Sequence, residues 1–182
     1  MNEDFDYIDQ FLSGQDKGFE MLVRKYQDRA LNIIYSLVGR DMDSEDIAQE
    51  AFLKVYHSLN SFRRRCMFST WLYRIVVNTA YDFLRKRKNL VSDKPALESA
   101  CSVSDGPREG ILRGETQVLI RDALASIPFQ FRSAVVLKDM EGLSYDEISV
   151  ILRCSIGTVE SRIYRARQLL KNKLSRLQGD LR

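Results

Sequence analysis

Apolar side chains recur along this chain at intervals of three and four residues, which is the spacing of one face of an α-helix. Between Lys17 and Leu37 this stripe continues for about five helical turns, and Gly39 follows where such a helix would end. No run alternates apolar and polar residues over the length of a strand. The pattern therefore predicts an all-α protein.

Two further helices follow in the first half. The first has a stripe that includes Ile47, Ala51 and Val55, and Ser44 is expected to cap its N-terminus. The next is expected to begin at Ser69 as N-cap and to end near Lys88. At about 100° per residue, its outer face gathers mostly polar and aromatic side chains: Trp71, Arg74, Asn78, Tyr81 and Arg85.

The helical pattern then stops. The stretch "NLVSDKPALESACSVSDGPREG" contains two prolines, two glycines and several serines without an apolar period. About 20 residues of this kind are too long for a turn inside one domain. We therefore expect a flexible linker at residues 91–111, between a small helical domain at residues 1–90 and another at residues 112–182.

The sequence pattern of the second domain predicts a helix-turn-helix from about Tyr145 to Tyr164. Before it we expect one helix from about Leu112 to Ser126, a break at Pro128, and a helix from about Phe131 to Met140. Ser144 and Glu147 have the spacing of a capping box. The pattern indicates DNA binding, and an ordinary helical hairpin is the alternative.

The last helix, which Ser155 can cap, has an apolar side and a polar side. Glu160 lies on the polar side near the N-terminal end, which contacts bases in helix-turn-helix proteins. Its carboxylate could accept a hydrogen bond from cytosine. Alternatively, it only complements the helix dipole or pairs with Tyr164 or Arg167. The polar side also contains Ser161, Tyr164, Arg165 and Gln168, with Arg162 and Arg167 at its edges.

The charge distribution supports contact with a polyanion. The net charge of the 182 residues is only +3. Residues 63–90, however, carry eight basic side chains against the single carboxylate of Asp82, and the C-terminal 52 residues also have a basic excess. Two basic segments in separate halves indicate two sites of nucleic-acid contact. Two solvated helical faces are the simpler alternative.

Other classes of function find little support in the sequence. The three cysteines, Cys66, Cys101 and Cys154, are far apart, and His57 is the only histidine, so we expect no metal site and no cofactor. Free thiols are the simplest interpretation, and a redox role for Cys66 among arginines is the alternative. The sequence contains no phosphate-binding glycine loop and no nucleophile–base pair, so it gives no indication of an enzyme. The acidic N-terminus lacks a signal peptide and no apolar run could span a membrane, so we expect a cytoplasmic protein.

Three segments resemble one family. "DIAQEAFLKVYHSLNSF", "FSTWLYRIVVNTAYDFLRKRK" and "GLSYDEISVILRCSIGTVESRIYRARQLL" are similar to bacterial extracytoplasmic-function (ECF) sigma factors of the sigma-70 family. The resemblance implies a non-enzymatic sigma factor that binds core RNA polymerase and directs it to promoter DNA. It also implies an anti-sigma factor as a partner, often anchored in the membrane. An autonomous helix-turn-helix transcriptional regulator is the alternative.

The resemblance assigns roles to both domains. Residues 1–90 would form sigma region 2, which binds polymerase and recognises and melts the −10 element. Residues 112–182 would form region 4, which recognises the −35 element. The implied polymerase contacts are Asp46, Gln49, Glu50, Phe52 and Lys54. The implied −10 contacts are Phe62, Arg63, Arg64, Arg65, Trp71, Arg74, Asn78, Arg85 and Lys86. The implied −35 contacts are Thr158, Glu160, Ser161, Arg162, Tyr164, Arg165 and Arg167.

Within the −10 set, Phe62 and Asn78 would hold a base that is flipped out of the non-template strand. Trp71 would stack on the strand, or else pack in the core. The chain departs from many members in two places: it has "RRRCM" in the loop after Phe62, and a carboxylate at Glu160 where relatives often have a basic residue. These two positions are the candidates for a distinct promoter preference.

Overall fold

The computed structural model describes residues 3–39, 43–92 and 119–179. Every regular element within these ranges is a helix, which confirms the predicted all-α class. The expected linker at residues 91–111 lies outside the described residues except for its first two positions, which continue a helix. The predicted helix start at Leu112 also lies outside them.

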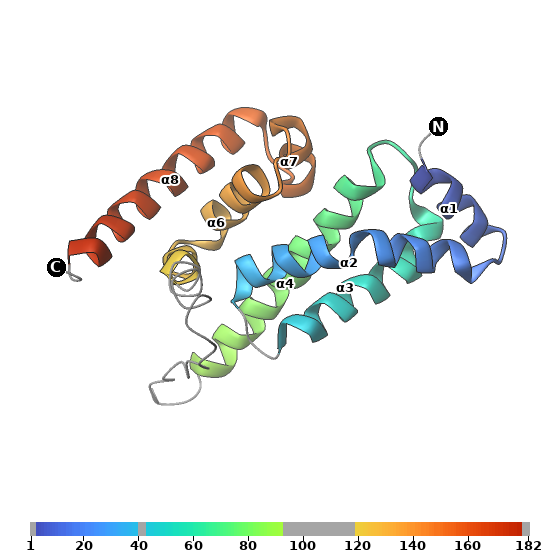
Figure 1. The fold of residues 1–182 in the computed structure, drawn as a ribbon, viewed down its shortest axis with the longest axis horizontal. Helices are drawn as coiled ribbons and strands as arrows, with labels where there is room; N and C mark the ends of the chain where they lie inside the picture. Colours follow the sequence, from blue (N-terminus) through green and yellow to red (C-terminus); the bar gives the residue numbers. More distant parts are fainter. Residues whose placement is uncertain (1–2, 40–42, 93–118, 180–182) are drawn as a thin grey trace, which may run out of the picture.

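The first domain is built around one long helix. Helix α2 (Asp16–Val38) lies against α1 (Glu3–Leu12), α3 (Asp43–Ser58) and α4 (Phe68–Ser92), and the short 3₁₀-helix η1 (Leu59–Ser61) follows α3 (Figure 1). Gly39 ends α2 as predicted, with a positive φ of 103° and its N–H donating to the Tyr35 carbonyl. The stripe predicted for α2 is largely buried, from Leu22 to Leu37.

Two predicted caps in this domain are wrong. Helix α3 already begins at Asp43, so Ser44 lies inside it; this side chain is buried and its Oγ donates to the Gly39 carbonyl at 2.7 Å. Helix α4 begins at Phe68, so Ser69 is not its N-cap, and the helix extends past Lys88 to Ser92. In both cases the helix begins before the serine, within the one or two residues by which helix ends commonly differ.

Helix α1 was not predicted, although its apolar residues have helical spacing. Phe5, Ile8 and Leu12 recur at three and four, and Ile8 is 1% exposed. The close crossing of α1 and α2 depends on Gly18, because a Cβ at that position would lie 2.2 Å from the Tyr7 carbonyl oxygen. The absence of a side chain therefore lets the two backbones approach.

The second domain contains residues 119–125, which are helical, and four further elements. These are α6 (Phe129–Val135), the π-helix η2 (Val136–Met140), α7 (Tyr145–Leu152) and α8 (Ile156–Gly179). The break at Pro128 is confirmed, but the segment after it begins at Phe129 as an α-helix that continues as a π-helix, and Gly142 with a positive φ of 70° follows. Helices α7 and α8 form the predicted helix-turn-helix.

The capping box at the start of α7 is present. The Ser144 Oγ accepts from the Glu147 N–H at 3.2 Å, and the Glu147 carboxylate accepts from the Ser144 N–H at 2.9 Å. Two backbone donors at the helix end are thereby satisfied. The local sequence thus fixes where the first helix of the helix-turn-helix begins.

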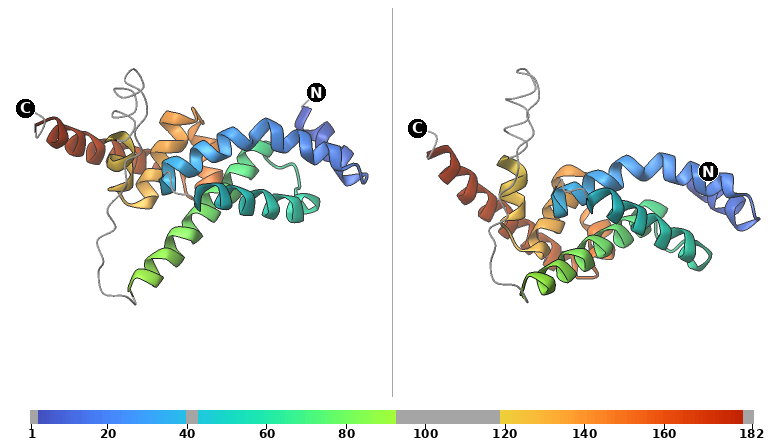
Figure 2. Two further views of the ribbon diagram at one scale, coloured as in Figure 1. Left: turned by 60° about the horizontal axis from the view of Figure 1, so that its bottom comes forward. Right: turned by 90° about the horizontal axis from the view of Figure 1, so that it is seen from below.

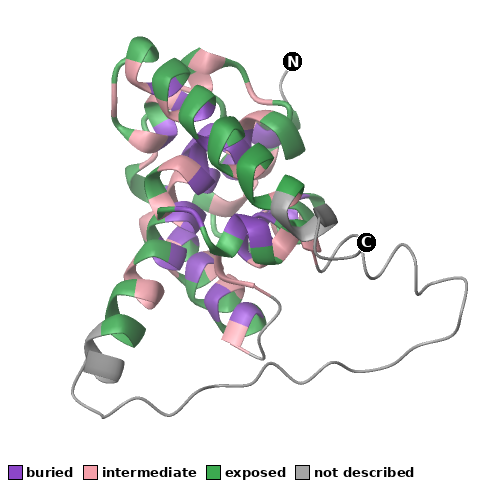
Figure 3. Cartoon of the chain, turned by 90° about the vertical axis from the view of Figure 1, so that its left-hand side faces the viewer, coloured by how far each residue is buried: buried purple, intermediate pink, exposed green. Residues whose placement is uncertain are grey.

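The two domains pack against each other. Helix α7 lies along α4, and α6 and η2 contact α2; the views in Figures 1 and 2 agree on this arrangement. The buried side chains form one continuous hydrophobic core that extends through both domains (Figure 3). The described parts of the chain therefore have a closed arrangement rather than two separate bodies.

Candidate nucleic-acid and polymerase interfaces

The outer face of α3 carries the residues expected to bind polymerase. Asp46, Gln49 and Glu50 are exposed on it. Leu53, which is 59% exposed, lies seven residues after Asp46 and therefore extends the same face. Sequence reasoning missed Leu53, although its position in the helical period could have shown it.

The other two residues of the expected polymerase set contact other parts of the first domain. Phe52 is half-buried and packs against the hydrophobic core. Lys54 Nζ forms an ion pair with Glu50 at 2.7 Å and donates to Thr79 Oγ1 of α4 at 3.2 Å. Both side chains therefore help to attach α3 to the rest of the domain.

An aromatic cluster fills the start of α4. The Phe62 ring centroid lies 5.1 Å from that of Trp71 and 6.0 Å from that of Phe68. Trp71 is only 8% exposed, so it packs in the core, as the alternative interpretation of this residue proposed. Phe62 is half-buried in the same cluster. The two aromatic residues expected to stack on DNA thus support the loop from inside.

The three consecutive arginines of the loop differ in their contacts. Arg63 and Arg65 are exposed. Arg64 forms an ion pair with Asp9 of α1, lies over the Phe5 ring at 5.2 Å, and has a positive φ of 53°. Arg64 therefore attaches the loop to α1, while Arg63 and Arg65 present their charge to solvent.

A row of residues follows one side of α4, and two of them, Asn78 and Tyr81, line a pocket against the second domain. Arg74, Asn78, Tyr81 and Arg85 recur at intervals of three and four and share one side of the helix. Asn78, Tyr81 and Arg85 are exposed, as is Lys86, and Arg85 pairs with Asp82 at 3.3 Å. The expected −10 residues of α4 other than Trp71 are therefore gathered on or beside one surface.

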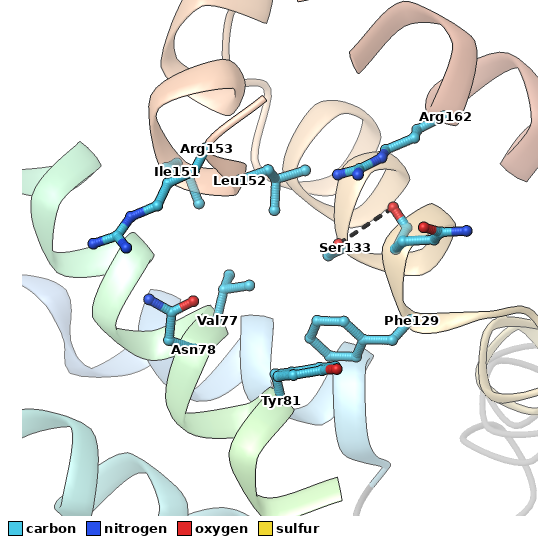
Figure 4. A pocket seen from close by; sticks show the side chains of 10 residues that line it. Val77, Asn78, Tyr81, Phe129, Ser133, Ile151, Leu152, Arg153 and Arg162 are labelled. Atoms are coloured by element: carbon cyan, nitrogen blue, oxygen red, sulfur yellow. Dashed lines mark hydrogen bonds between the residues drawn. The ribbon is translucent and has the colours of Figure 1, made fainter. Parts of the chain in front are cut away.

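Asn78 lines a pocket between the domains (Figure 4). Asn78 and Val77 project from α4 toward Ile151, Leu152 and Arg153 at the end of α7. The residues that line this pocket do not include Phe62, the other residue expected to hold a flipped base. The remaining lining residues are Tyr81, Phe129, Gln130, Ser133 and Arg162.

Helix α8 has the predicted division into two sides. Ser155 Oγ accepts from the Thr158 N–H at 3.2 Å, which confirms the predicted cap. Val159, Ile163 and Ala166 are at most 2% exposed, and Leu170 is half-buried. The outer side is open to solvent along three turns: Glu160, Ser161, Tyr164, Arg165 and Gln168 are all exposed.

Four residues of the expected −35 set have internal partners, and the first is Ser161, whose Oγ donates to the Thr158 carbonyl at 2.9 Å. Thr158 Oγ1 lies 2.8 Å from Ser155 Oγ. The half-buried Arg162 donates from Nη1 to Cys154 Sγ at 3.6 Å and faces the pocket between the domains. Arg167 forms an ion pair with Asp139 of η2, whose carboxylate raises the pKa of the guanidinium through their hydrogen bonds. These side chains position α8 in this structure.

Two of the three cysteines lie within the described residues. Cys66 and Cys154 are half-buried free thiols, while Cys101 lies outside the described residues. Within the described ranges, no three His, Cys, Asp or Glu side chains are grouped so that they could hold a metal ion. None of the helices in these ranges is both long and apolar enough to cross a membrane.

Both domains match known protein families. Residues 22–90 match the family model of sigma-70 region 2, and residues 117–170 match that of sigma-70 region 4. The RNA polymerase sigma-H factor of Pseudomonas aeruginosa is 35% identical, over 96% of this chain and 95% of its own. The ECF RNA polymerase sigma-E factor of Escherichia coli K12 is 37% identical, over 93% of each chain. The chain belongs to the ECF sigma factors of the sigma-70 family.

Solved structures of similar shape support this assignment. The sigma factor aligns with CnrH in its complex with the cytosolic domain of CnrY, with a TM-score of 0.73 and 25% identity over 96% of this chain and 98% of the other. It also aligns with RpoE of Bartonella quintana in complex with the anti-sigma factor NepR, with a TM-score of 0.72 and 27% identity over 87% and 98%. Because each alignment covers both domains, the similarity includes how they are arranged.

Proposed function

We propose that this sigma factor binds core RNA polymerase through the outer face of α3 and directs it to promoters that contain −10 and −35 elements. The observation that carries the proposal is the outer side of α8, where polar and basic side chains are exposed from Glu160 to Gln168, opposite a stripe that is buried from Val159 to Ala166. A helix with this division, second in a helix-turn-helix, can enter the major groove.

The polymerase contact is proposed at Asp46, Gln49 and Glu50, with Leu53 as an apolar addition. Exposed carboxylates on this face suit a partner surface that presents cations. Leu53, which is 59% exposed and extends this face by one turn, would be covered by the partner, which favours binding through loss of apolar surface. Phe52 and Lys54 remain in the proposed set, and their internal contacts assign them mainly to holding α3 in place.

The −10 contact is proposed along α4 and the loop before it. Arg63, Arg65 and Arg74 would hold phosphates of the melted strand, with Asn78 toward a base edge. Phe62, Arg64 and Trp71 would act by holding the loop, because all three contact the first domain itself. Arg85 and Lys86 would continue the phosphate contacts toward the end of the helix.

The −35 contact is proposed at the N-terminal half of α8. Glu160, Ser161 and Tyr164 would face base edges, and Arg165 would face a phosphate or guanine. Thr158 lies at the helix start, where backbone N–H groups favour a phosphate. Arg162 and Arg167 complete the set only if they exchange their present partners for DNA.

Control by an anti-sigma factor is part of the proposal. The structure of RpoE, which resembles this chain, is a complex with the anti-sigma factor NepR, and that of CnrH is a complex with the cytosolic domain of CnrY. An arrangement shared with both supports a protein partner that binds the closed form. We propose a non-enzymatic, cytoplasmic protein, since its partners are polymerase and DNA.

Transcription tests the proposed function. The full chain is combined with core polymerase and a promoter library in which the −10 and −35 regions are randomised, and the transcripts are sequenced. We expect start sites to collect downstream of two enriched elements. A gel shift without polymerase distinguishes a sigma factor from an autonomous helix-turn-helix regulator, because the regulator would bind specific DNA tightly on its own. Strong specific binding by the isolated chain would contradict the proposal.

A further inference from the structure

The loop at residues 62–67, which joins η1 to α4, has an unusual backbone conformation at its middle. Arg64 has a φ of 53°, in the left-handed region that glycine and asparagine adopt more readily than arginine. A bulky residue keeps such a conformation only where the surrounding structure stabilises it. The shape of this loop therefore depends on the contacts that Arg64 makes.

The Arg64 side chain contacts two residues of α1. Its Nη2 forms an ion pair with the Asp9 carboxylate, and its guanidinium carbon lies 5.2 Å from the centroid of the Phe5 ring. Phe5 and Asp9 are four positions apart, so they share one face of α1. The Phe5 ring centroid also lies 6.4 Å from that of Phe62, the first residue of the loop. One helix face thus contacts the loop at its start and at its middle.

Helix α1 is itself firmly attached to the first domain. Asp4 is 3% exposed, and its carboxylate accepts from the Tyr26 hydroxyl of α2 at 2.6 Å. The same carboxylate forms an ion pair with Lys25 Nζ at 2.6 Å. Gly18 lets the backbones of α1 and α2 approach closely. A loop that is held by α1 is therefore held in one position relative to the whole domain.

The loop presents an exposed arginine on each side of Arg64. These residues, Arg63 and Arg65, belong to the proposed −10 contacts. Side chains that are already in position lose less conformational freedom when they bind, and they favour the one arrangement of DNA that fits them. A loop that left this shape would present the two arginines in several positions and would discriminate less between −10 sequences.

We propose that α1 positions the −10 recognition loop through Asp9 and Phe5. By holding Arg64 in its left-handed conformation, these two positioning residues set where the exposed arginines of the loop meet DNA. Helix α1 lies outside residues 22–90, which match sigma-70 region 2, so this role is additional to that match. The inference rests on the proposed function for what the loop recognises.

The expected effect is moderate because the ion pair lies at the surface. The side chains of Arg64 and Asp9 are 38% and 60% exposed. An exposed pair of this kind typically changes an equilibrium by up to about fivefold. Loss of the Asp9 carboxylate should therefore lower the discrimination between the preferred and the second-best base at −10 positions by about two- to fivefold.

One variant removes the ion pair and a second provides a matched control. Asp9→Asn removes the charge and keeps the size of the side chain. Asp6→Asn makes the same change at an exposed carboxylate of the same helix. Both variants lose one negative charge, so a general change in attraction to phosphates is common to both. A difference between them therefore reports the contact with Arg64.

A charge exchange tests the pair itself. Asp9→Arg places two guanidinium groups together, and adding Arg64→Asp restores an opposite pair in the reversed order. Aspartate tolerates the left-handed conformation at position 64. If the pair holds the loop, the double variant should recover the −10 preference that Asp9→Arg alone loses.

Trypsin measures the loop directly, because it cleaves after arginine. The free full-length chain is digested briefly, and mass spectrometry quantifies cleavage at Arg63, Arg64 and Arg65. We expect this cleavage to be about two- to fivefold faster in Asp9→Asn than in the wild type and Asp6→Asn, because the loop opens locally more often. Circular dichroism verifies that each variant keeps the helix content of the wild type.

Transcription by the holoenzyme measures the promoter preference. The library with randomised −10 and −35 regions is transcribed with each variant, and the enriched bases are compared. We expect Asp9→Asn to broaden the preference at −10 and to leave that at −35 unchanged. A general folding defect would instead lower transcription from all promoters without changing either preference.

The outcomes separate the inference from the proposed function. Equal cleavage of the loop in Asp9→Asn and Asp6→Asn, an unchanged −10 preference in Asp9→Asn, or a charge exchange that does not recover the preference would each overturn the positioning role. Failure of the proposed function would be seen in the wild type, as the absence of any enriched −10 element, whatever the rate of cleavage by trypsin.

Discussion

Arg167 and Asp139 connect α8 to the π-helix η2 through two parallel hydrogen bonds. Nε donates to Oδ2 at 3.1 Å and Nη2 donates to Oδ1 at 2.6 Å. A bidentate pair of this kind fixes the guanidinium plane. An arginine that the sequence places at the DNA surface is therefore also a contact that orients the recognition helix.

This pairing predicts unequal contributions from two neighbouring arginines. We expect Arg165→Ala to weaken promoter binding by the holoenzyme by roughly tenfold, as for loss of a ~1.5 kcal/mol charged hydrogen bond, and to reduce the salt dependence by about one phosphate contact. Arg167→Ala should leave the salt dependence nearly unchanged. Filter binding at several salt concentrations measures both, and equal losses of slope would show that Arg167 leaves Asp139 on DNA.

Glu160 predicts a change in promoter preference. If its carboxylate accepts from a cytosine, Glu160→Arg should change the preferred base pair at one −35 position, because arginine favours guanine. The library transcription assay compares both proteins, with Glu160→Gln as the isosteric control that keeps an acceptor. Tighter binding at every sequence with an unchanged preference would mean that Glu160 only modifies the charge near the helix end.

The close packing around Gly18 predicts that one added methyl group lowers the stability of the fold. Its Cβ would lie 2.2 Å from the Tyr7 carbonyl oxygen and 2.8 Å from the Phe11 nitrogen, so α1 would have to move. We expect Gly18→Ala to lower the free energy of unfolding by about 1–3 kcal/mol, as for other overpacked sites. Denaturant unfolding measures this change.

Gly157 is the matched control. It lies in the first turn of α8, and a Cβ there would meet nothing within 4 Å. Gly157→Ala should therefore be neutral or stabilising by up to ~1 kcal/mol, because it reduces the freedom of the unfolded chain. Equal destabilisation by both substitutions would argue against the close helix crossing as the cause.

Tyr26 predicts a loss of stability at alkaline pH. Its hydroxyl donates to the buried Asp4 carboxylate at 2.6 Å, and burial together with this bond raises the Tyr26 pKa above its ordinary value of 10.0. The resulting stabilisation is complete below pH 10 and is lost as the pH rises above it, by up to ~1.4 kcal/mol per pH unit.

The substitution Tyr26→Phe should flatten this dependence. Denaturant unfolding between pH 8 and about 11 measures the slopes of the two proteins, and the variant should be less stable at pH 8 because it removes the hydrogen bond from Tyr26 to Asp4. Exposed Tyr164, at 66% exposure, provides the control: Tyr164→Phe should keep the wild-type slope. Parallel curves for wild type and Tyr26→Phe would exclude Asp4 and Tyr26 as the source.

Most of the fold could be predicted because helical periodicity and capping chemistry are local. The stripe of α8, the capping box at Ser144 and the end of α2 at Gly39 all depend on residues within a few positions of each other. The predictions that are wrong depend on features other than helical spacing. The Ser44 side chain is buried and its Oγ donates to the Gly39 carbonyl, and the π-helix at 136–140 has no distinct apolar period.

The contact between the domains could not be predicted from the sequence. Arg132 resembles any basic residue of a helical surface, and its acceptors are backbone carbonyls, one of them 95 positions away in the chain. Trp71 presents the related difficulty, because an aromatic ring suits both a DNA surface and a core. Sequence patterns assign residues to faces, but only the packed structure shows which faces meet.

The continuous core has a consequence for how long the protein survives in its different states. Because the domains share buried surface, each helps to stabilise the other, and we expect the free closed chain to unfold in one cooperative transition. Separation removes that mutual support, so an open chain without a partner exposes more sites to proteases. Polymerase would protect the open form by covering it. The rate at which this sigma factor is degraded would then depend on the fraction of it that is bound to polymerase.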